Sequence, residues 1–356
     1  MPHISENSTV LITGGAGFIG SAMVRHLVLE RKCRVINIDN LSYSGNLLNL
    51  EEISSLKNYH FYELSIGERD SVYDCLDKYK PNVVINFAAE SHVDKSIDNP
   101  GIFFKTNVLE TLNLLMAVKD YLKNNDLDFL FHHISTDEVY GDIPMNDKPS
   151  NEATPYKPSS PYAASKASSD HIVRAFARTY GLPATISNCS NNYGSFQHPE
   201  KLIPHMIINA LNNKKLPIYG DGKQIRDWLH VDDHISGILR IIEHGKTGQT
   251  YNIGGLNEVT NLEVVNLICQ TLDKELPRKD KLSYKELISF VGDRPGHDRR
   301  YAIDCPKISN TLNWKPSLEF KIGLEQTVKW YLNNQDWWNS IMEDGYSHIR
   351  QGLQKK

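Results

Sequence analysis

The chain of 356 residues has few cysteines, no long apolar run and no marked excess of one charge. Its five cysteines are scattered and never spaced as C-x-x-C, which argues against a disulfide framework or a zinc site and favours a reducing, cytoplasmic compartment. No apolar run approaches the ~18 residues of a membrane-spanning helix, and the first residues lack the pattern of a secretion signal. With 39 basic against 43 acidic residues, charge gives no support for binding to nucleic acid or to a membrane surface. We therefore expect a soluble, cytoplasmic protein whose partner is a small molecule.

The first half of the chain shows a regular alternation of short apolar runs and helical periodicity. Apolar, β-branched runs predict strands at residues 10–13, 34–39, 59–64, 83–87, 129–134 and 184–186. Apolar residues at helical spacing predict helices after residue 18, through 108–118 and over 163–180. Strand–helix alternation implies right-handed parallel crossovers and a sheet covered on both faces. The sequence thus predicts an α/β fold with a Rossmann-type, doubly wound parallel sheet.

The alternation stops near residue 188, where turn clusters and short mixed elements begin. We expect residues 1–188 to form the doubly wound domain, and residues 189–227 and 255–356 to form a smaller, irregular α/β lobe. The segment 228–254 has a helix-then-strand pattern and is predicted to rejoin the first sheet. A length of about 100–200 residues per domain suits this division.

A glycine-rich loop, Gly14-Gly15-Ala16-Gly17-Phe18-Ile19-Gly20, lies between the first predicted strand and the first helix. Glycines let the backbone approach a pyrophosphate, which then sits at the positive N-terminus of the helix. Asp39 ends the second predicted strand, where it would accept hydrogen bonds from ribose hydroxyls and repel a 2′-phosphate. In isolation the glycines could merely relieve crowding in a tight turn, but the strand, helix and acid together predict an NAD site.

Two Y-x-x-x-K patterns occur in the sequence. Tyr219 and Lys223 enclose Gly-Asp-Gly, a turn, so their side chains need not share a face. Tyr162 and Lys166 lie four residues apart on a predicted helix and therefore share one face. A nearby ammonium is expected to lower the phenol pKa from about 10, so that Tyr162 can take a proton from a sugar hydroxyl. The alternative is a tyrosine packed on a lysine stem.

Ser135-Thr136-Asp137-Glu138 follows the fifth predicted strand. Ligands in open α/β sheets bind beyond the carboxyl ends of the strands, near the point where strand order reverses. Two adjacent carboxylates there could cap a helix or be solvated loop charges. Near the cofactor and Tyr162 they are better interpreted as a paired acid and base. Neighbouring negative charge and partial desolvation would raise the pKa of one carboxyl group, so that it stays protonated at neutral pH.

Together these residues resemble the extended short-chain dehydrogenase/reductase family, and within it the nucleotide-sugar 4,6-dehydratases. The glycine loop and the Tyr162–Lys166 pair mark only the superfamily. The triplet Thr136-Asp137-Glu138 is more specific, because similar epimerases and decarboxylases carry other residues at the two acidic positions. The resemblance covers nearly the whole chain, through the segments 13–20, 88–94, 135–141, 162–166, 199–204 and 225–228.

The resemblance implies an NAD-dependent lyase that removes water from a nucleotide-activated glucose. Tyr162 would deprotonate the 4-hydroxyl while NAD takes the C4 hydride, with Lys166 holding the phenolate and the nicotinamide ribose. Thr136 would hydrogen-bond the C4 oxygen. Glu138 would then remove the C5 proton while Asp137 protonates the departing C6 hydroxyl, and hydride returns to C6. The product is a 4-keto-6-deoxy sugar, and NAD is regenerated in each turnover.

Other site residues follow from the same resemblance. Besides Tyr162 and Lys166, the expected cofactor contacts are Gly14, Gly17, Phe18, Ile19, Gly20, Asp39, Asn40, Ser42, Ser65, Ile66, Ala88 and Ala89. Ser65 stands where the family often has an aspartate, so it would accept a hydrogen bond without charge. The expected substrate contacts are Ser91, Asn191, Glu200, Lys201, Arg226, Asn261, Arg294 and His297, with Tyr346 near the base or sugar. No metal is expected. Without the resemblance, the diphosphate- and nucleoside-binding positions would be ordinary surface polar residues.

Substrate and assembly are also expectations from the resemblance. The segment 191–194 is similar to enzymes that take dTDP-glucose, whereas relatives using UDP-glucose more often have valine at the position of Asn192. UDP-glucose and CDP-glucose remain alternatives, and a 4-epimerase is a weaker one because it needs no acid–base pair at C5 and C6. A non-catalytic NAD-binding protein would be expected to have lost part of the catalytic set. The apolar helices near 108–121 and 163–180 resemble the family's dimer faces, which implies a homodimer, although burial against the sheet would explain their apolar stripes equally well.

Overall fold

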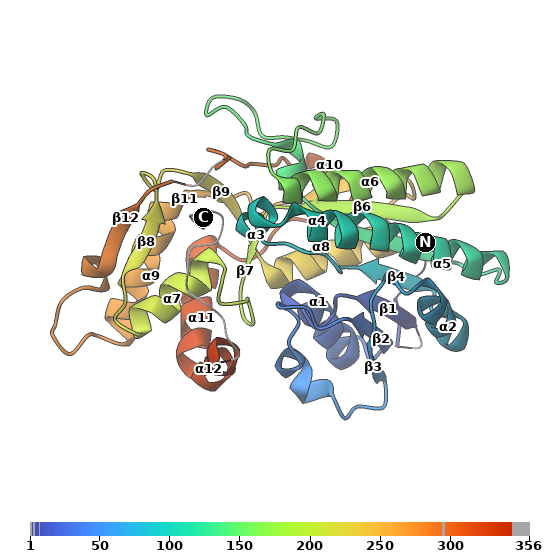
Figure 1. Ribbon diagram of the computed structural model, residues 1–356, viewed down its shortest axis with the longest axis horizontal. Helices are drawn as coiled ribbons and strands as arrows, with labels where there is room; N and C mark the ends of the chain where they lie inside the picture. The colour runs from blue at the N-terminus through green and yellow to red at the C-terminus, as the bar shows by residue number, and fades with distance from the viewer. Residues whose placement is uncertain (1, 3, 7, 294–295, 344–356) are drawn as a thin grey trace.

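The computed structural model describes residues 2, 4–6, 8–293 and 296–343 (Figure 1). Its largest element is a seven-stranded sheet with the order β10-β6-β5-β4-β1-β2-β3, in which every neighbouring pair is parallel. The strands are β1 (Thr9–Thr13), β2 (Arg34–Asp39), β3 (Tyr59–Glu63), β4 (Val83–Asn86), β5 (Leu130–Thr136), β6 (Ala184–Cys189) and β10 (Thr250–Ile253). This arrangement confirms the predicted doubly wound parallel sheet. The chain turns back between β3 and β4, so the switch in strand order lies between β1 and β4.

Both faces of the sheet are covered by helices. Successive side chains of a strand point to opposite faces, so Val10 and Ile12 enter one core while Leu11 enters the other. The first core is completed by α1 (Phe18–Arg25), α8 (Val231–His244) and α10 (Pro306–Leu312). The second core is completed by α2 (Arg69–Tyr79), α5 (Thr111–Lys123) and α6 (Pro161–Tyr180). Figure 1 shows α5 and α6 lying side by side along one face.

The helices differ in detail from the sequence-based expectation. The first predicted helix continues past α1 as a π-helical turn, η1 (His26–Glu30). The helix predicted through 108–118 falls in the π-helical η3 (Lys105–Glu110) and in α5, and two short helices that were not predicted, α3 (Val93–Asp98) and α4 (Pro100–Phe104), precede it. Helix α2 was not predicted, because it buries only a narrow stripe of Val72, Cys75 and Leu76 in an otherwise polar segment.

The remaining elements form a second lobe with its own core. Strands β7 (Asn191–Tyr193), β9 (Ile225–His230) and β11 (Glu258–Thr260) make one small sheet, while β8 (Leu216–Tyr219) pairs with β12 (Ile288–Val291). Around Tyr193 and Trp228 pack the helices α7 (Leu202–Leu211), α9 (Asn261–Glu275), α11 (Phe320–Asn333) and α12 (Gln335–Glu343). The short 3₁₀ helices are η2 (Leu47–Ile53), η4 (Asp137–Tyr140) and η5 (Tyr284–Leu287).

Two connections cross between the lobes. Strand β10, from the segment predicted to rejoin the first sheet, pairs with β6 through Thr250 and Ile186. Residues Ile303 to Trp314, which the sequence argument placed in the second lobe, contribute to the first core. The domain boundaries at 188, 228 and 254 therefore stay a proposal, supported by the separate core around Tyr193 and Trp228.

Within the described ranges, no helix combines the length and apolar character needed to cross a bilayer. The same part of the chain holds no group of three or more His, Cys, Asp or Glu side chains placed to bind a metal ion. All five cysteines are free thiols and buried.

Candidate active site

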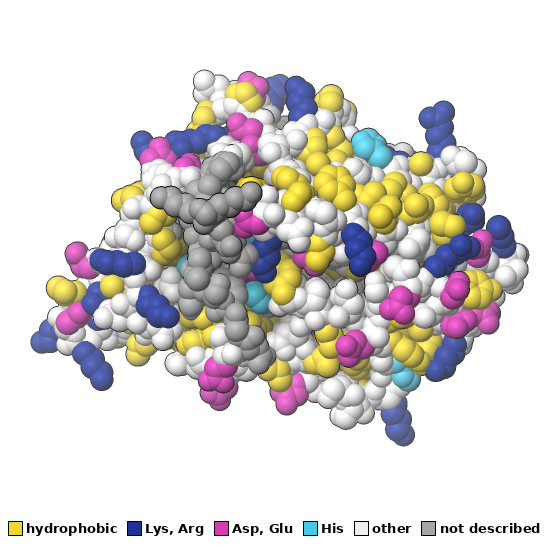
Figure 2. Space-filling model, in the orientation of Figure 1, with side chains coloured by type: hydrophobic (Ala, Val, Ile, Leu, Met, Phe, Trp, Pro, Cys, Tyr) yellow, Lys and Arg dark blue, Asp and Glu magenta, His cyan; other side chains and the backbone are white. Residues whose placement is uncertain are grey.

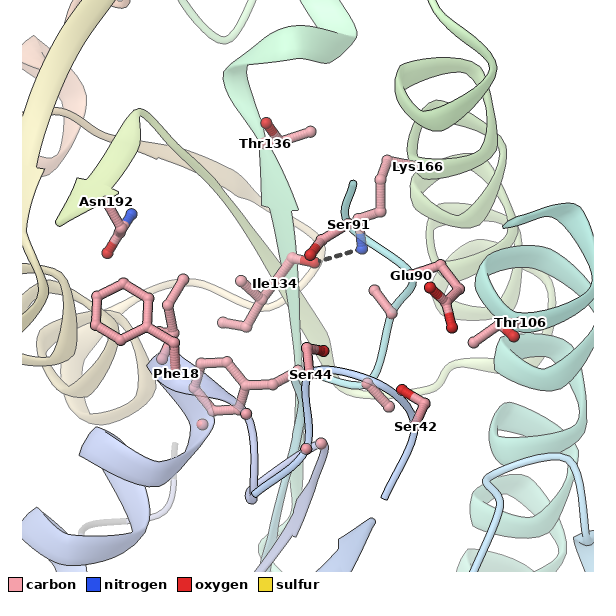
Figure 3. A pocket seen from close by; sticks show the side chains of 18 of the residues that line it. Phe18, Ser42, Ser44, Glu90, Ser91, Thr106, Ile134, Thr136, Lys166 and Asn192 are labelled. Atoms are coloured by element: carbon pink, nitrogen blue, oxygen red, sulfur yellow. Dashed lines mark hydrogen bonds between the residues drawn. The ribbon is translucent and has the colours of Figure 1, made fainter. Parts of the chain in front are cut away.

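A cavity of about 270 Å³ lies at the carboxyl edge of the sheet, where the strand order switches. Its lining comes from the ends of β1, β2, β4, β5 and β6, from α6, and from the segment that follows β7 in the second lobe. Figure 3 shows side chains from these separate segments around one space, among them Phe18, Ser91, Thr136, Lys166 and Asn192. The cavity is thus where the fold directs a ligand.

Most of the residues predicted from the sequence meet at this cavity. Those lining it are Gly14, Gly17, Phe18, Ile19, Gly20, Asp39, Asn40, Ser42, Ile66, Ala88, Ala89, Ser91, Thr136, Asp137, Glu138, Tyr162, Lys166, Asn191, Glu200 and Lys201. Within the described chain, the predicted residues that do not line it are Ser65, Arg226, Asn261 and His297. Arg294 and Tyr346 lie outside the described residues.

The glycine loop has two kinds of glycine. A Cβ on Gly14, whose φ is +69°, would lie 2.6 Å from the backbone nitrogen of Ala88, and one on Gly20 would lie 2.2 Å from the Gly14 oxygen. These glycines are required by close packing of the loop itself. A Cβ on Gly17 would meet only the Gly14 oxygen, at an ordinary 3.4 Å. Internal packing therefore does not explain Gly17, whereas a ligand passing close to the loop would.

The beginning of α1 suits an anionic ligand. Gly17 is the N-cap residue, and no described side chain caps the helix there. The first turn of a helix carries N–H groups without partners inside the helix and a partial positive charge. Both features fit the pyrophosphate of a dinucleotide.

Asp39 lies at the end of β2 and is buried. Its Oδ2 accepts a hydrogen bond from the Ala16 N–H at 2.9 Å, and its Oδ1 accepts one from the Leu41 N–H at 2.8 Å. Burial raises the pKa of Asp39, and these two hydrogen bonds act in the opposite direction. A carboxylate has about four acceptor positions, so the two oxygens retain capacity for further donors such as ribose hydroxyls.

Ser65 is displaced from the cavity although its neighbours Leu64 and Ile66 line it. Its Oγ donates to Glu110 Oε2 at 3.1 Å and accepts from the Gly67 N–H at 3.0 Å. The hydroxyl is therefore used to hold the local turn. A cofactor contact by Ser65 stays a prediction.

The acidic pair stands at the start of η4, directly after β5. Thr136 caps η4 by accepting a hydrogen bond from the Glu138 N–H at 3.3 Å, and its Oγ1 donates to Asp137 Oδ1 at 3.4 Å. Asp137 is 3% exposed, and its Oδ2 has no hydrogen-bond partner among the described residues. Burial, and then the charge of Glu138, raise the pKa of Asp137 well above its usual range. This raised pKa favours the neutral carboxylic acid, the form that can donate a proton, beside the half-buried Glu138.

Tyr162 and Lys166 lie in the first turns of α6, which begins after the N-cap Ser160. Burial, and then the negative charge of Glu138, raise the pKa of Tyr162 well above 10. The sequence argument expected Lys166 to lower this pKa, and for the protein alone that expectation is wrong. The physical reason is that burial strips solvent from a phenolate, while the charge that affects the Tyr162 pKa most is the carboxylate of Glu138. Lys166 Nζ instead donates to the Ile134 carbonyl at 2.7 Å (Figure 3).

A buried ion cluster joins the cofactor side of the cavity to the second lobe. Glu200 accepts hydrogen bonds from Tyr43 at 3.1 Å and from Lys95 at 3.2 Å. Burial acts to raise the pKa of Glu200, but Lys201 and then His92, His198 and Lys95 outweigh it and hold the pKa at about 2. Lys95 also lies over the Tyr43 ring, 3.1 Å from its centroid.

The cluster extends to the predicted Ser91, whose carbonyl accepts a hydrogen bond from Lys201 at 3.0 Å. Tyr43 and Lys95 were missed by sequence reasoning. Tyr43 is adjacent to the predicted Ser42, and Lys95 follows the 88–94 motif, but no local pattern indicates that the two meet. Tyr43 and Lys95 do not themselves line the cavity; missed residues that do line it include Ser44, Glu90, Thr106, Asn192, Gln197 and His198.

Three predicted substrate residues lie apart from the cavity lining. Arg226 of β9 donates to the carbonyls of Ile225 and Asp298 at 2.7 and 3.0 Å, and its guanidinium lies 4.4 Å from the Tyr301 ring centroid. His297 Nδ1 is 2.6 Å from a carboxylate oxygen of Asp293.

Asn261 is the first residue of α9, and its Oδ1 is buried without a partner in the described chain. The Asn192 amide, in contrast, lines the cavity but is occupied. It donates to the Ser190 carbonyl and accepts from His234 Nδ1, both at 2.9 Å. Asn192 is therefore better suited to hold the loop shape than to bond a base through its amide.

Comparison with known proteins supports this site. A family model described as GDP-mannose 4,6 dehydratase matches residues 11–327. The dTDP-glucose 4,6-dehydratase of Neisseria meningitidis serogroup B is 50% identical over 352 residues, covering 97% of this chain and 99% of that protein. The dTDP-glucose 4,6-dehydratase of Salmonella typhimurium is 52% identical, with 95% and 96% covered.

Solved structures agree with the sequence matches. The dTDP-glucose 4,6-dehydratase of Streptomyces venezuelae, crystallised with NAD bound, aligns with a TM-score of 0.86 at 40% identity, covering 94% of this chain and 99% of that chain. The UDP-glucose 4-epimerase of Thermotoga maritima aligns with a TM-score of 0.82 at 30% identity, covering 92% and 99%. The resemblance to nucleotide-sugar dehydratases is thereby confirmed. Because these matches span nearly the whole chain and its cavity carries the acidic pair with the Tyr–Lys pair, the chain belongs to the GDP-mannose 4,6-dehydratase family.

Proposed function

We propose that the chain is a lyase that converts dTDP-glucose to dTDP-4-keto-6-deoxyglucose and water, with NAD as its resident cofactor. The observation that carries the proposal is Asp137, a buried neutral acid with an unpartnered oxygen, placed beside Glu138 and Tyr162 in one cavity. An epimerase has no use for a second acid–base pair next to the tyrosine. The relatives that are about half identical over nearly the full length are dTDP-glucose 4,6-dehydratases.

The residues on the sheet side of the cavity fit NAD. Gly17 and the uncapped start of α1 would receive the pyrophosphate, and Asp39 would accept the ribose hydroxyls. When bound, NAD supplies the oxidant for C4 and the reductant for C6, and its positively charged ring favours the phenolate of Tyr162. The solved Streptomyces venezuelae relative contains NAD.

The chain's own residues then carry out four proton transfers. Tyr162 takes the proton of the C4 hydroxyl, and Thr136 donates a hydrogen bond to the C4 oxygen. The C4 ketone acidifies C5–H, and Glu138 removes that proton. Asp137 gives its proton to the C6 hydroxyl, which leaves as water. As C6 is reduced, Glu138 returns a proton to C5, and exchange with solvent then restores the starting protonation states of Tyr162 and Asp137. Loss of water requires Asp137 to be protonated while the adjacent Glu138 is ionised. Burial favours this difference because it raises the pKa of Asp137.

The second lobe supplies the groups for a sugar nucleotide. Lys201 brings a positive charge to the cavity lining, next to the neutral amide of Asn191, whose Oδ1 is buried without a partner in the described chain. A lysine ammonium near a diphosphate is a favourable charge pair. Contacts from Arg226, Asn261, Arg294 and His297 are part of the proposal and require the substrate to reach beyond the cavity lining.

The function is tested by incubating the purified protein with dTDP-, UDP- or CDP-glucose and no external oxidant. We expect dTDP-glucose to give a product lighter by one water, and deuterium placed at C4 to appear at C6. A 4-epimerised product of unchanged mass would instead favour the epimerase. Loss of water from UDP- or CDP-glucose alone would overturn the nucleotide assignment, and deuterium lost to solvent would overturn the internal transfer.

We also propose a homodimer formed through the helices near 108–121 and 163–180, which are η3, α5 and α6, together with the adjoining α4. Ile102, Phe104, Leu109 and Tyr180 are 40–58% exposed on these helices. Figure 2 shows hydrophobic side chains gathered over the region of α5 and α6. Exposed apolar patches of this kind mark interaction sites.

The five buried free thiols suit a reducing compartment, and the cytoplasmic location stays a prediction.

Placing a charge on the proposed dimer face should give a monomer. Leu109, 58% exposed on η3, would bury its side chain in the dimer, so Leu109→Glu introduces a charge that the interface cannot solvate. Sedimentation velocity should show a dimer for the natural chain and a monomer for this variant. Leu282→Glu is the matched control, because Leu282 is 55% exposed in the second lobe. A dimer that survives Leu109→Glu places the interface elsewhere.

A further inference from the structure

The ammonium of Lys166 is a buried charge whose balance is not explained by its direct contacts. Lys166 is 4% exposed, and its Nζ donates to the Ile134 carbonyl at 2.7 Å. His133 Nε2 lies 3.5 Å from the same Nζ atom. Neither group carries a negative charge, and a buried cation without a counter-charge is strongly unfavourable.

A buried carboxylate lies one helical turn further along α6. Asp170 is fully buried, and its Oδ2 accepts hydrogen bonds from Ser135 Oγ at 2.8 Å and from the Tyr156 hydroxyl at 2.9 Å. Its Oδ1, which makes no regular hydrogen bond in the described chain, faces His133 Nε2 at 3.4 Å. Burial acts to raise the pKa of Asp170, but His133, Lys166 and Ser135 outweigh it and lower the pKa below its usual value. Asp170 is therefore ionised.

A directional chain of hydrogen bonds sets which nitrogen of His133 carries the proton. The Ala88 N–H donates to Thr13 Oγ1 at 3.4 Å, so the Thr13 hydroxyl donates to Asn86 Oδ1, at 2.6 Å. The Asn86 amide nitrogen then donates to His133 Nδ1 at 3.1 Å. Because Nδ1 accepts, Nε2 carries the proton, and this nitrogen lies 3.2 Å from Ser169 Oγ and 3.4 Å from Asp170 Oδ1. The chain begins at Ala88, which lines the cavity, and ends beneath Lys166.

The other charged and titratable groups around Lys166 and His133 do not supply the missing negative charge. Burial lowers the pKa of His133 to about 4, so the ring is neutral. Burial raises the pKa of Cys189, on β6, to about 12, so this thiol is neutral as well. Arg174, the next turn of α6, donates to the Tyr156 hydroxyl at 2.7 Å and stacks on that ring.

Asp170 and Cys189 are the groups whose negative charge would raise the pKa of Lys166, against the larger lowering by burial. With Cys189 neutral, the carboxylate of Asp170 is the remaining counter-charge.

We propose that Asp170, held by Ser135 and Tyr156, is a positioning residue whose carboxylate keeps Lys166 protonated under the active site. Asp170 touches neither the cavity nor the reacting atoms. Its kinetic consequence rests on the proposed function, because that function requires a cationic Lys166 beside the Tyr162 phenolate. Its effect on the charge of Lys166 does not depend on the substrate.

Asp170→Asn removes the counter-charge with little change of shape. An opposite charge at close range shifts a pKa by about 1–3 units, so the pKa of Lys166 should fall by at least about one unit, a tenfold change in its ionisation constant. Carbon-13 NMR of the NAD-loaded protein labelled at lysine Cε measures this, with the Lys166 signal identified by its absence in Lys166→Arg. The fall of kcat/KM on the alkaline side of its pH profile should move to lower pH by the same amount as the pKa of Lys166. Activity should recover as the pH is lowered.

Two further variants separate charge from structure. Tyr156→Phe removes a donor to Asp170 but leaves the carboxylate, and Asp170→Glu keeps the charge, so both should retain the Lys166 titration near that of the natural chain. If Asp170 has only a structural role, Asp170→Asn should lower kcat by the same factor at every pH and leave the alkaline fall of kcat/KM at the same pH. That result would overturn the proposal. An unchanged pKa of Lys166 in Asp170→Asn would overturn it as well.

If Asp170→Asn does not fold, Asp170→Ser, which leaves room for water, must show the same shift. Failure of both neutral variants to fold while Asp170→Glu folds would make the residue structural and would also overturn the proposal. If the natural chain removes water from none of the sugar nucleotides, the proposed function fails, and the Lys166 titration still decides the role of Asp170.

Discussion

Replacing Glu138 with glutamine should lower kcat for loss of water by a factor of about 10²–10⁴, the usual contribution of general acid–base catalysis. Glutamine keeps the shape of the side chain and cannot accept the C5 proton. Because Glu138 is placed after C4 oxidation in the proposed sequence, the variant should also stop exchange of C5–H with solvent. NAD binding should be unchanged, since the glycine loop and Asp39 are separate from η4.

The measurement is product formation from dTDP-glucose in deuterated water, followed by mass spectrometry and proton NMR at C5. Asp147→Asn is the matched control, because Asp147 is an exposed carboxylate on the loop after η4; its kcat should equal that of the natural chain. Normal dehydration by Glu138→Gln would show that another group is the base.

Asp137→Asn should give a similar loss of kcat, about 10²–10⁴, for a different reason. Asparagine cannot protonate the departing C6 hydroxyl, but Glu138 remains able to remove the C5 proton. Exchange of C5–H with solvent should therefore persist while water loss is slowed. This contrast separates the two acids: Glu138→Gln loses both processes, and Asp137→Asn loses only elimination.

The same variant should be more stable than the natural chain at neutral pH. Burial raises the folded-state pKa of Asp137 above its unfolded value of 3.8. As pH rises above 3.8, the unfolded state releases this proton while the folded state keeps it, so the stability of the natural chain falls until the folded-state pKa is reached. Asparagine does not titrate and removes this loss.

Thermal unfolding should show a higher Tm for Asp137→Asn at pH 7 and a smaller difference as pH approaches 3.8. The activity of the natural chain should be lost as pH rises through the raised pKa, because the acid must be protonated. Equal Tm values at neutral pH, or full activity of the asparagine variant, would contradict the assignment of Asp137 as the proton donor.

The parts of the site that could be predicted are those contained in one short segment. The glycine loop, Asp39 and the Tyr162–Lys166 pair each belong to a strand–turn–helix unit or to one face of one helix, where spacing along the chain dictates spacing in the fold. The adjacent Asp137 and Glu138 were placed at the sheet edge for the same reason. The parallel sheet followed from the alternation of strands and helices.

Contacts between distant segments were not predictable in this way. Glu200 meets Tyr43 and Lys95 because the loop after β2, helix α3 and the segment before α7 converge at one edge of the cavity. Asp170, four residues after Lys166, lies on the same helix, so the spacing alone could have suggested the two as neighbours; what the sequence does not show is that both are buried against His133 of β5. Helix α2 was missed because few of its residues are apolar.

By itself, then, the sequence determined the order of strands and helices, the chemistry available at the carboxyl edge of the sheet, and the family. Only the tertiary structure decided the protonation states on which that chemistry depends. The pKa of Tyr162 rises where local spacing alone indicated a fall, and burial raises the pKa of Asp137 well above its usual range. The reason is that a pKa depends on how completely the rest of the chain excludes water from a group and on which charges remain nearby. Those quantities are set by packing of segments far apart in the sequence.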